Sequence, residues 1–280
     1  MEIQYWEKSS NENDEEYIGN KKLAMEISSK GYKSIINEYT YIDSPEIEKT
    51  FQLIPNVFDS INGVGVDLGG GVGCISSTLA LKNSVKQIFC VELVKEVVEL
   101  CQPIVKAQIL GEKIFKVISV VGNFDNLRLD SKSIDFIVAW DSMHHSDNPI
   151  KTLKECKRIL KKNHKMIIID RAHNNSTPDF EIERMLNITY DAEFLKKNYR
   201  PLDQKLTRRQ NGEHEYRFFE WERFFDKAGF EILTGAVIKT KNEENLNLKN
   251  DNNYKEIFVD YDLGAFGNRK VVYVISPRNN

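Results

Sequence analysis

The sequence predicts an α/β fold: a three-layer sandwich in which helices cover both faces of a mostly parallel, seven-stranded sheet. Three observations support this prediction. From residue 63 short apolar runs alternate with amphipathic stretches, the first run ends in a cluster of glycines, and the second run ends in a carboxylate. Such alternation is typical of parallel strands joined by helical crossovers.

Five apolar runs are predicted as the first core strands, at residues 64–68, 88–92, 114–121, 134–140 and 166–170. A helix is predicted between the last two, because Asp147 or Asn148 can cap it and Pro149 suits its first turn. A later helix is indicated by apolar residues at helical spacing from Trp221 to Ala228, with Gly229 placed to end it. Strands at about 230–238 and 271–276 complete the seven.

Three stretches depart from the alternation and suggest a domain organisation. Residues 1–60 are predicted as a mainly helical N-terminal cover, and residues 61–280 as one catalytic domain. Residues of about 171–220 form a charged, aromatic-rich insertion that is expected to act as a lid. Residues 241–255 contain six asparagines and are predicted as a loop.

Composition indicates an ordinary globular protein, with 41% apolar and 29% charged residues and a formal net charge of −3. This charge gives no general attraction to nucleic acid or to an anionic membrane, so neither is an expected partner. The four cysteines have no C-x-x-C spacing, and the polar N-terminus is not typical of a signal peptide. A cytoplasmic protein with reduced thiols is therefore expected, and an oligomer is possible.

The central motif is Asp67-Leu68-Gly69-Gly70-Gly71-Val72-Gly73, at the end of the first predicted strand. Glycine allows the backbone to approach a cofactor and to adopt unusual dihedral angles. Glu92 ends the second strand, where a carboxylate can accept hydrogen bonds from both ribose hydroxyls of an adenosine. The motif and Glu92 together predict a nucleoside cofactor.

Two details disfavour a dinucleotide. Cys74 stands where the third glycine of the dinucleotide fingerprint is expected. The charge of Asp67, expected beside the ligand, would repel a pyrophosphate but suits an ammonium or a sulfonium group.

The motif and the segments that follow it resemble class I, Rossmann-like S-adenosylmethionine-dependent methyltransferases of the small-molecule type. The resemblance extends over about residues 63–240 and rests on Gly122–Leu127, Ser133–Val138, Met143–Pro149 and Leu153–His164. Two positions depart from the family pattern: Asn123 replaces the usual aspartate, and Asn163-His164 replaces a P-G-G turn. The resemblance implies S-adenosylmethionine as cofactor, held by Asp67, Leu68, Gly69, Gly70, Gly71, Gly73, Glu92, Leu93, Asn123, Phe124 and Trp140.

Methyl transfer from a sulfonium is an in-line displacement, and a hydroxyl acceptor also needs a base, most often histidine. In this fold the acceptor lies over the carboxyl ends of strands four and five. His145 is the favoured base, with a pKa that the following helix is expected to lower. Asp170 is expected to orient His173. The catalytic candidates are Asp141, His144, His145 and His173.

Two other interpretations of these residues stay open. One of the paired histidines could brace the following helix. The same cluster could hold a metal through oxygen and nitrogen ligands, although its spacing is not diagnostic and no metal is predicted.

The insertion combines arginines with aromatic residues, which suggests contacts to an anionic or sugar-like acceptor. The alternative is that Glu213, Glu215 and Glu220 pair with these arginines on a solvated surface. The substrate-binding candidates are Asp170, Arg171, Tyr190, Arg208, Arg209 and His214.

The sequence therefore predicts an enzyme that methylates a small molecule, on an oxygen of a sugar-like or phosphate- or carboxylate-bearing metabolite. Three alternatives stay open: an RNA or protein methyltransferase, an NAD-dependent oxidoreductase, and a catalytically silent cofactor-binding subunit. Base N-methylation is less favoured, because Trp140-Asp141-Ser142-Met143 stands where an N-P-P-Y motif is expected.

Overall fold

The computed structural model describes residues 2–6, 14–54, 56–240, 253–259 and 269–278. Within these residues one sheet of nine strands has the order β1-β4-β3-β2-β5-β6-β9-β7-β8. β9 is antiparallel to both of its neighbours, and the other pairs are parallel. The strands are β1 Ile3–Tyr5, β2 Gly63–Leu68, β3 Val85–Glu92, β4 Val117–Val121, β5 Ile134–Trp140, β6 Leu160–Ala172, β7 Phe230–Thr240, β8 Lys255–Val259 and β9 Arg269–Pro277.

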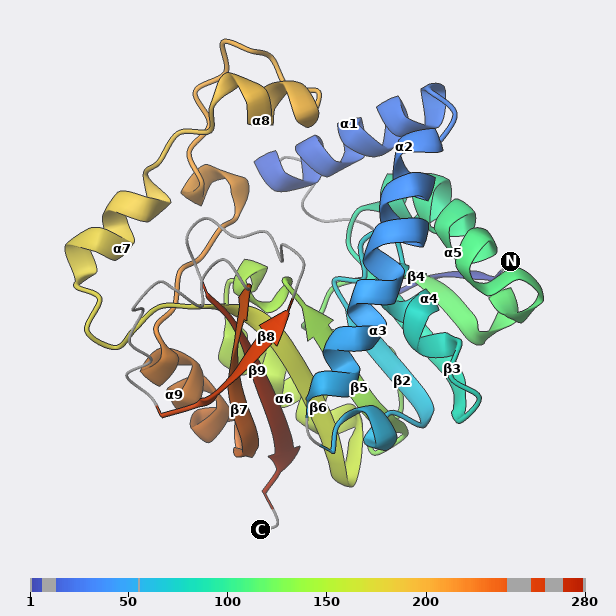
Figure 1. Ribbon diagram of the computed structural model, residues 1–280, viewed down its shortest axis with the longest axis vertical. Coiled ribbons are helices and arrows are strands. Elements are labelled where there is room, and N and C mark those ends of the chain that lie inside the picture. Colours follow the sequence, from blue (N-terminus) through green and yellow to red (C-terminus); the bar gives the residue numbers. More distant parts are fainter. Residues whose placement is uncertain (1, 7–13, 55, 241–252, 260–268, 279–280) are drawn as a thin grey trace.

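Helices cover both faces of the sheet (Figure 1). The α-helices are α1 Glu15–Ser29, α2 Lys33–Ile35, α3 Ser44–Leu53, α4 Cys74–Ala80, α5 Gln102–Leu110, α6 Pro149–Ile159, α7 Asp179–Leu186, α8 Ala192–Lys197 and α9 Phe218–Ala228. Shorter helical turns are η1 Ile36–Asp43, η2 Phe58–Ser60, η3 Val97–Cys101, η4 Gly111–Lys116, η5 Met143–His145 and η6 Arg209–Asn211.

Two buried clusters hold the layers together. On one face α1, α3, α4 and α5 pack against the sheet around residues such as Phe51, Leu79 and Val105. On the other face α6 and α9 pack around Leu153 and Trp221. Since β5 and β6 contribute residues to the clusters on both faces, the centre of the sheet is buried on both sides, as in other helix-covered parallel sheets.

The prediction of an α/β fold with a mostly parallel sheet is confirmed, whereas the strand count is wrong, because nine strands are described instead of seven. The two additional strands are β1 and β8 at the edges, which are only three and five residues long. The third predicted strand begins at Val117 rather than at residue 114, because Gly111–Lys116 form a 3₁₀ turn. The predicted loop 241–255 lies outside the described residues up to residue 252, and its last residue begins β8.

Local sequence signals set several helix ends and turns. Asn148, not Asp147, caps α6 through a hydrogen bond from the Lys151 amide to its side chain (3.1 Å). Gly229 ends α9 with a φ of 83°, as its position predicts. Asn163 adopts a φ of 64° and thereby forms the turn that usually contains glycine in this family.

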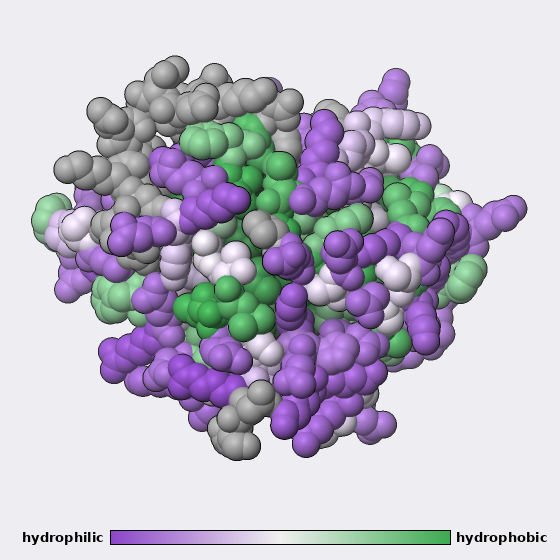
Figure 2. All heavy atoms as spheres, turned by 60° about the horizontal axis from the view of Figure 1, so that its bottom comes forward, coloured by the Kyte–Doolittle hydropathy of each residue, from purple (hydrophilic) through white to green (hydrophobic). Residues whose placement is uncertain are grey.

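The parallel strands all end at the same side of the sheet, and α1 lies above that side next to α8 (Figure 1). The opposite end of the molecule, where these strands begin, comes forward in Figure 2 and presents mainly hydrophilic side chains around a narrower hydrophobic band. In the described part of the chain, no helix is both long enough and apolar enough to cross a membrane.

Candidate active site

The glycine loop follows β2 directly and packs against two neighbouring strand ends. Gly69, Gly71 and Gly73 all have positive φ angles, of 66°, 49° and 84°, which glycine adopts without strain. A β-carbon on Gly70 would collide with the Cys90 Sγ, whereas one on Gly71 would meet nothing within 4 Å. The loop is therefore tight on its inner side at Gly70 and open at Gly71.

Asp67 lies beneath this loop rather than on its surface. Its side chain accepts a hydrogen bond from the Ser76 hydroxyl (2.6 Å), and the residue is 1% exposed. Burial raises the pKa of Asp67 to about 6, even though the bond from Ser76 opposes this shift. The carboxylate that the sequence predicts beside the ligand is thus buried next to Gly70, and its contact with the ligand stays a prediction.

Glu92 ends β3 with its carboxylate fixed by two backbone amides. Oε2 accepts from the Gly71 amide (3.1 Å), and Oε1 accepts from the Val94 amide (2.9 Å). Each carboxylate oxygen has a further lone pair, so Glu92 can also accept from ligand hydroxyls. Burial raises the pKa of Glu92, although the amides of Val94 and Gly71 act in the opposite direction.

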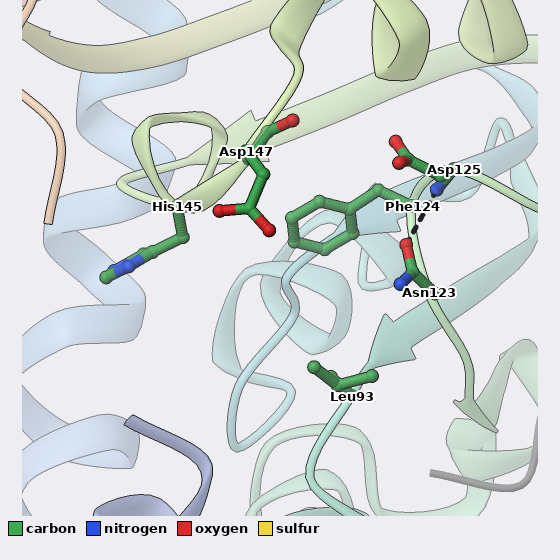
Figure 3. Close-up of a pocket in the computed structure, with 7 residues that line it drawn as sticks. Leu93, Asn123, Phe124, Asp125, His145 and Asp147 are labelled. Atoms are coloured by element: carbon green, nitrogen blue, oxygen red, sulfur yellow. Dashed lines mark hydrogen bonds between the residues drawn. The ribbon is translucent and has the colours of Figure 1, made fainter. Parts of the chain in front are cut away.

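Beyond Glu92, a smaller pocket lies among the segments that follow β3, β4 and β5 (Figure 3). It has a volume of about 90 Å³ and is lined by Leu93, Asn123, Phe124, Asp125, His145, Ser146 and Asp147. In Figure 3 the Phe124 ring points toward Asp147, and Leu93 lies below it. The Asn123 Oδ1 accepts a hydrogen bond from the Asp125 amide (2.9 Å), which holds this loop in a turn.

The largest of these cavities opens over the glycine loop and has a volume of about 220 Å³. α1 and the lid contribute to it as well as the strand ends. Its lining residues are Asp14, Glu16, Tyr17, Asn20, Gly69, Glu92, Leu93, Val94, Phe124, Asp141, Ser142, His145, Asp147 and Gly212. A further cavity of about 180 Å³, mostly apolar, shares Asn20 and Glu92 with it and extends under α1.

These residues fit S-adenosylmethionine. Glu92 presents a fixed carboxylate for a ribose, and Leu93 and Phe124 offer apolar surfaces for a base. The open space at Gly71 admits a ligand close to the backbone. Carboxylates dominate the charged groups around the cavity, which suits a ligand that carries a sulfonium and an ammonium group.

Five predicted cofactor residues are not among those lining these cavities: Asp67, Leu68, Gly70, Gly73 and Trp140, which lies at the end of β5. The Trp140 ring packs on Phe51 of α3 with the centroids 5.7 Å apart. The predicted cofactor contact of Trp140 stays a prediction, and in this structure the ring packs in the core.

His144 is buried at the carboxyl edge and bonded on both ring nitrogens. Its Nδ1 lies 2.7 Å from the Asp170 Oδ1, and the Arg171 guanidinium donates to Nε2. Because a guanidinium can only donate, Nε2 accepts and the proton of the neutral ring is on Nδ1. Burial lowers the pKa of His144, although Asp170 acts in the opposite direction. The expectation that Asp170 orients His173 is wrong: Asp170 orients His144, because both are buried at adjacent strand ends.

His145 lies in η5, ahead of α6, and lines the cavity. Its Nδ1 is 3.2 Å from the Glu16 carboxylate of α1 and 3.1 Å from the Gly212 carbonyl oxygen of the lid. Burial alone would lower the pKa of His145, but the hydrogen bond and charge of Glu16 raise it to about 9. The predicted lowering by the helix dipole is therefore wrong, and the ring is an imidazolium at neutral pH.

His173 lies beyond the end of β6 and faces the lid. Its Nε2 is 2.6 Å from the Glu215 carboxylate, and its amide donates to the Tyr216 carbonyl oxygen (2.9 Å). His214 of the lid donates from Nδ1 to the His144 carbonyl oxygen (2.8 Å). His173 and His214 thus attach the lid to the sheet and are not among the residues that line the 220 Å³ cavity.

The lid arginines pair within the protein. Arg208 is buried and forms an ion pair with Glu215, with Glu213 3.7 Å away. Arg209 is half exposed and pairs with Glu183 of α7 (2.7 Å). Arg209 is therefore paired on a solvated surface, as the alternative interpretation expects. Arg208 instead belongs to a buried network of charged residues.

Arg171 connects that network to the sheet edge. Its guanidinium lies 2.6 Å from Glu213 and 3.4 Å from Asp141. The Tyr190 hydroxyl donates to Glu213 (3.1 Å). The predicted acceptor contacts of Arg171, Tyr190, Arg208 and Arg209 stay predictions, since each of these residues already has a partner in the protein.

Two groups near the cavity were missed by the sequence reasoning. Asp14, Glu16, Tyr17 and Asn20 approach it from the N-terminal segment and α1, and Lys270 of β9 forms an ion pair with Asp141. The α1 residues carry no motif, and Lys270 follows an asparagine-rich stretch far along the chain. Only the folded topology brings either group to this edge.

These features indicate an enzyme that uses a nucleoside cofactor: a glycine loop in an α/β fold, an acid at the end of β3, and a cavity lined by carboxylates. Residues 66–168 match the family model described as a methyltransferase domain. The chain therefore contains a methyltransferase domain, which agrees with the predicted enzyme class and with S-adenosylmethionine as the cofactor.

Individual relatives are distant. The chain is 27% identical over 156 residues to the sarcosine/dimethylglycine N-methyltransferase of Aphanothece halophytica; this match covers 54% of the chain and 55% of that protein, so the chain spans about half of the relative's length. The structure of a SAM-dependent methyltransferase from Leishmania major is similar with a TM-score of 0.56 and 13% identity, over 96% of this chain and 87% of that one. The structure of the YcgJ protein from Bacillus subtilis is similar with a TM-score of 0.52 and 16% identity, over 85% of this chain and 98% of that one. At these identities the structures support the fold alone.

Proposed function

We propose that this enzyme transfers the methyl group of S-adenosylmethionine to the nitrogen of a small, amine-bearing molecule. The observation that carries the proposal is the charge of the 220 Å³ cavity. Five carboxylates line it, Asp14, Glu16, Glu92, Asp141 and Asp147, against one basic residue, His145. A concave site lined by one sign of charge concentrates ligands of the opposite sign, and a protonated amine is such a ligand.

An anionic acceptor is supported less well. Of the arginines that the sequence predicts as its contacts, Arg171 and Arg208 pair with Glu213 and Glu215, and Arg209 pairs with Glu183. Binding a phosphate through the first two would leave buried carboxylates without their partners, which is costly.

An oxygen acceptor, as the sequence predicts, also needs a base, and the histidines near the cavity are poorly suited to that task. The raised pKa of His145 leaves it protonated at neutral pH, and both ring nitrogens of His144 are bonded. An aliphatic amine with a pKa of about 10 binds mostly as the ammonium and reacts as the neutral amine, after its proton has left to solvent; this loss needs no strong base, because the group is far more acidic than an alcohol. An alcohol needs its proton removed in the transition state.

The main task of the chain's own residues is then to position the acceptor. The cofactor provides an activated methyl group, and the protein has to hold the acceptor in line with it and exclude water. α1 and the lid cover the cavity from above, through Glu16 and Gly212. The similarity to an N-methyltransferase that acts on sarcosine and dimethylglycine supports an amine acceptor, although it extends over about half of each chain.

The test uses acceptors that differ only in the reacting atom. The full-length protein is incubated with methyl-labelled S-adenosylmethionine and with matched pairs: ethanolamine and ethylene glycol, or glycine and glycolate. We expect label in the amine of each pair that is accepted. Label in the hydroxyl compounds alone, or in RNA or protein substrates instead, would overturn the proposed acceptor class.

A further inference from the structure

Asp141 has an unusual backbone at the point where β5 leaves the sheet. Its φ is 51°, in the left-handed region that residues other than glycine rarely adopt, although aspartate and asparagine do so more often than most. Its amide donates to the Ile169 carbonyl oxygen (2.7 Å), which fixes the residue to the end of β6. Strained residues of this kind persist where the surrounding structure holds them, and they concentrate at functional sites.

This backbone conformation places Asp141 next to the glycine loop. The following residue, Ser142, donates from its hydroxyl to the Leu68 carbonyl oxygen (2.7 Å), and a β-carbon on Gly69 would lie 2.5 Å from the Ser142 Cβ. Asp141 and Gly69 line the same cavity, and 41% of the Asp141 side chain is exposed.

The Asp141 carboxylate is held asymmetrically. Lys270 of β9, Arg171 of β6 (3.4 Å) and His144 of η5 (3.9 Å) all contact the same oxygen, Oδ1. Lys270 is 2% exposed, so its charge is buried against this carboxylate. Desolvation opposes ionisation of Asp141, as does Asp170, but Lys270, His144 and Arg171 together lower the pKa of Asp141.

We propose that Asp141 is the carboxylate that orients the acceptor's amino group and stabilises the positive charge that passes from sulfur to nitrogen at the reacting centre, with Lys270 and Arg171 as positioning residues that hold its Oδ1 and leave Oδ2 for the ligand. The inference rests on the proposed amine acceptor and names the residue that recognises it. Among the five carboxylates of the cavity, Asp141 is the one fixed by two buried cations, so its direction is set before any ligand binds.

The test uses two ligands whose binding does not depend on knowing the acceptor. S-Adenosylhomocysteine is uncharged at sulfur, whereas sinefungin carries a primary ammonium group in place of the methyl sulfonium. The ratio of their dissociation constants therefore reports the stabilisation of a cation at the reacting centre. Calorimetry on the full chain measures both ligands in the wild type, in Asp141→Asn and in Asp135→Asn, a matched change at an aspartate that pairs with Lys161 outside the cavity.

We expect Asp141→Asn to reduce the preference for sinefungin at least tenfold, with S-adenosylhomocysteine affinity within about threefold of the wild type. Asp135→Asn should change the ratio less than twofold. An unchanged ratio in Asp141→Asn would overturn the inference while the proposed function stands. If S-adenosylhomocysteine binds but hydroxyl acceptors alone are methylated, the amine proposal fails even if the ratio responds as expected.

The positioning role of Lys270 has its own readout. In the wild type the preference for sinefungin should stay constant from pH 6 to 8, because the surrounding cations keep Asp141 ionised. In Lys270→Met the pKa of Asp141 rises, so the preference should fall at least threefold toward pH 6, and Lys270→Arg should restore it. Lys239→Met, which removes a buried lysine paired with Glu256 on β8, is the control. A preference independent of pH in Lys270→Met would exclude Lys270 from this role.

Discussion

The His145 imidazole and the Glu16 carboxylate, 3.2 Å apart, join the edge of the sheet to the N-terminal helix α1. The lid holds the same helix from another side: Arg200 donates to the Glu15 carbonyl oxygen (2.7 Å) and to the Asn211 side chain (2.9 Å). α1 and the lid are therefore bonded to each other where they line the cavity. His145 bonds both of them to the segment that follows β5, which also carries Asp141.

This connection predicts a pH dependence of stability. The pKa of His145 is raised from 6.5 to about 9, so the ion pair stabilises the fold fully below about pH 6.5, and this contribution is lost as the pH rises through 9. The difference in unfolding free energy between the wild type and His145→Gln should shrink between pH 6.5 and 9.5 in urea titrations. The control is His164→Gln, which lies near the start of β6, at the end of the sheet away from the cavity. A difference that does not change with pH would contradict the assignment.

Removal of the fixed carboxylate at the end of β3 should weaken cofactor binding. Glu92→Ala loses hydrogen bonds to a charged group, so affinity for S-adenosylmethionine and S-adenosylhomocysteine should fall by about 1–3 kcal/mol. Calorimetry measures both ligands. Glu99→Ala, which removes a carboxylate bonded to Tyr5, should bind like the wild type. Unaltered binding in Glu92→Ala would place the ribose contact elsewhere.

Neighbouring lid arginines should differ in their effect on stability. Arg208→Ala leaves the buried Glu215 without its closest cation, and breaking a buried pair costs about 3–5 kcal/mol. Arg209→Ala removes a half-exposed pair with Glu183, and such pairs contribute about 0–1 kcal/mol. Denaturant unfolding of both variants tests this difference; equal losses would show that Arg208 is not buried as described.

The close packing of the glycine loop at Gly70 predicts a further difference between two variants. In Gly70→Ala the new methyl group collides with Cys90, and overpacking of this kind costs about 1–3 kcal/mol. Since the loop has to shift, cofactor affinity should fall as well. Gly122→Ala is the control, because its added β-carbon meets Trp6 at 3.4 Å, an ordinary contact. Thermal unfolding and calorimetry on both variants should separate them, and identical behaviour would argue against a tightly packed loop.

The sequence predicts the parts of this protein that depend on local patterns. The glycine loop, the acid that ends β3 and the capped helix α6 can each be recognised from a few neighbouring residues, and the structure has these local features as expected. The partners of the histidines could not be predicted in this way. Asp170 is three residues from His173 in the sequence but bonds His144, and Glu16 is 129 residues from His145.

The ion pairs near the cavity could not be predicted from the sequence either. Lys270 and Asp141 lie on segments that only the antiparallel pairing of β9 with β6 brings together. Because these contacts decide which groups are protonated, the sequence could predict a methyltransferase but not the ionisation of its site. The proposed preference for a nitrogen over an oxygen acceptor rests on that ionisation.

The most direct measurement of this preference identifies the atom that receives the methyl group. The full-length protein is incubated with S-adenosylmethionine labelled with carbon-13 in the methyl group and with ethanolamine, which offers an amine and a hydroxyl in one molecule. The carbon-13 chemical shift of the product distinguishes an N-methyl from an O-methyl group. We predict the N-methyl product, with the hydroxyl unmodified. An O-methyl product would contradict the central claim, because it would show that the carboxylate-lined cavity delivers an oxygen to the donor.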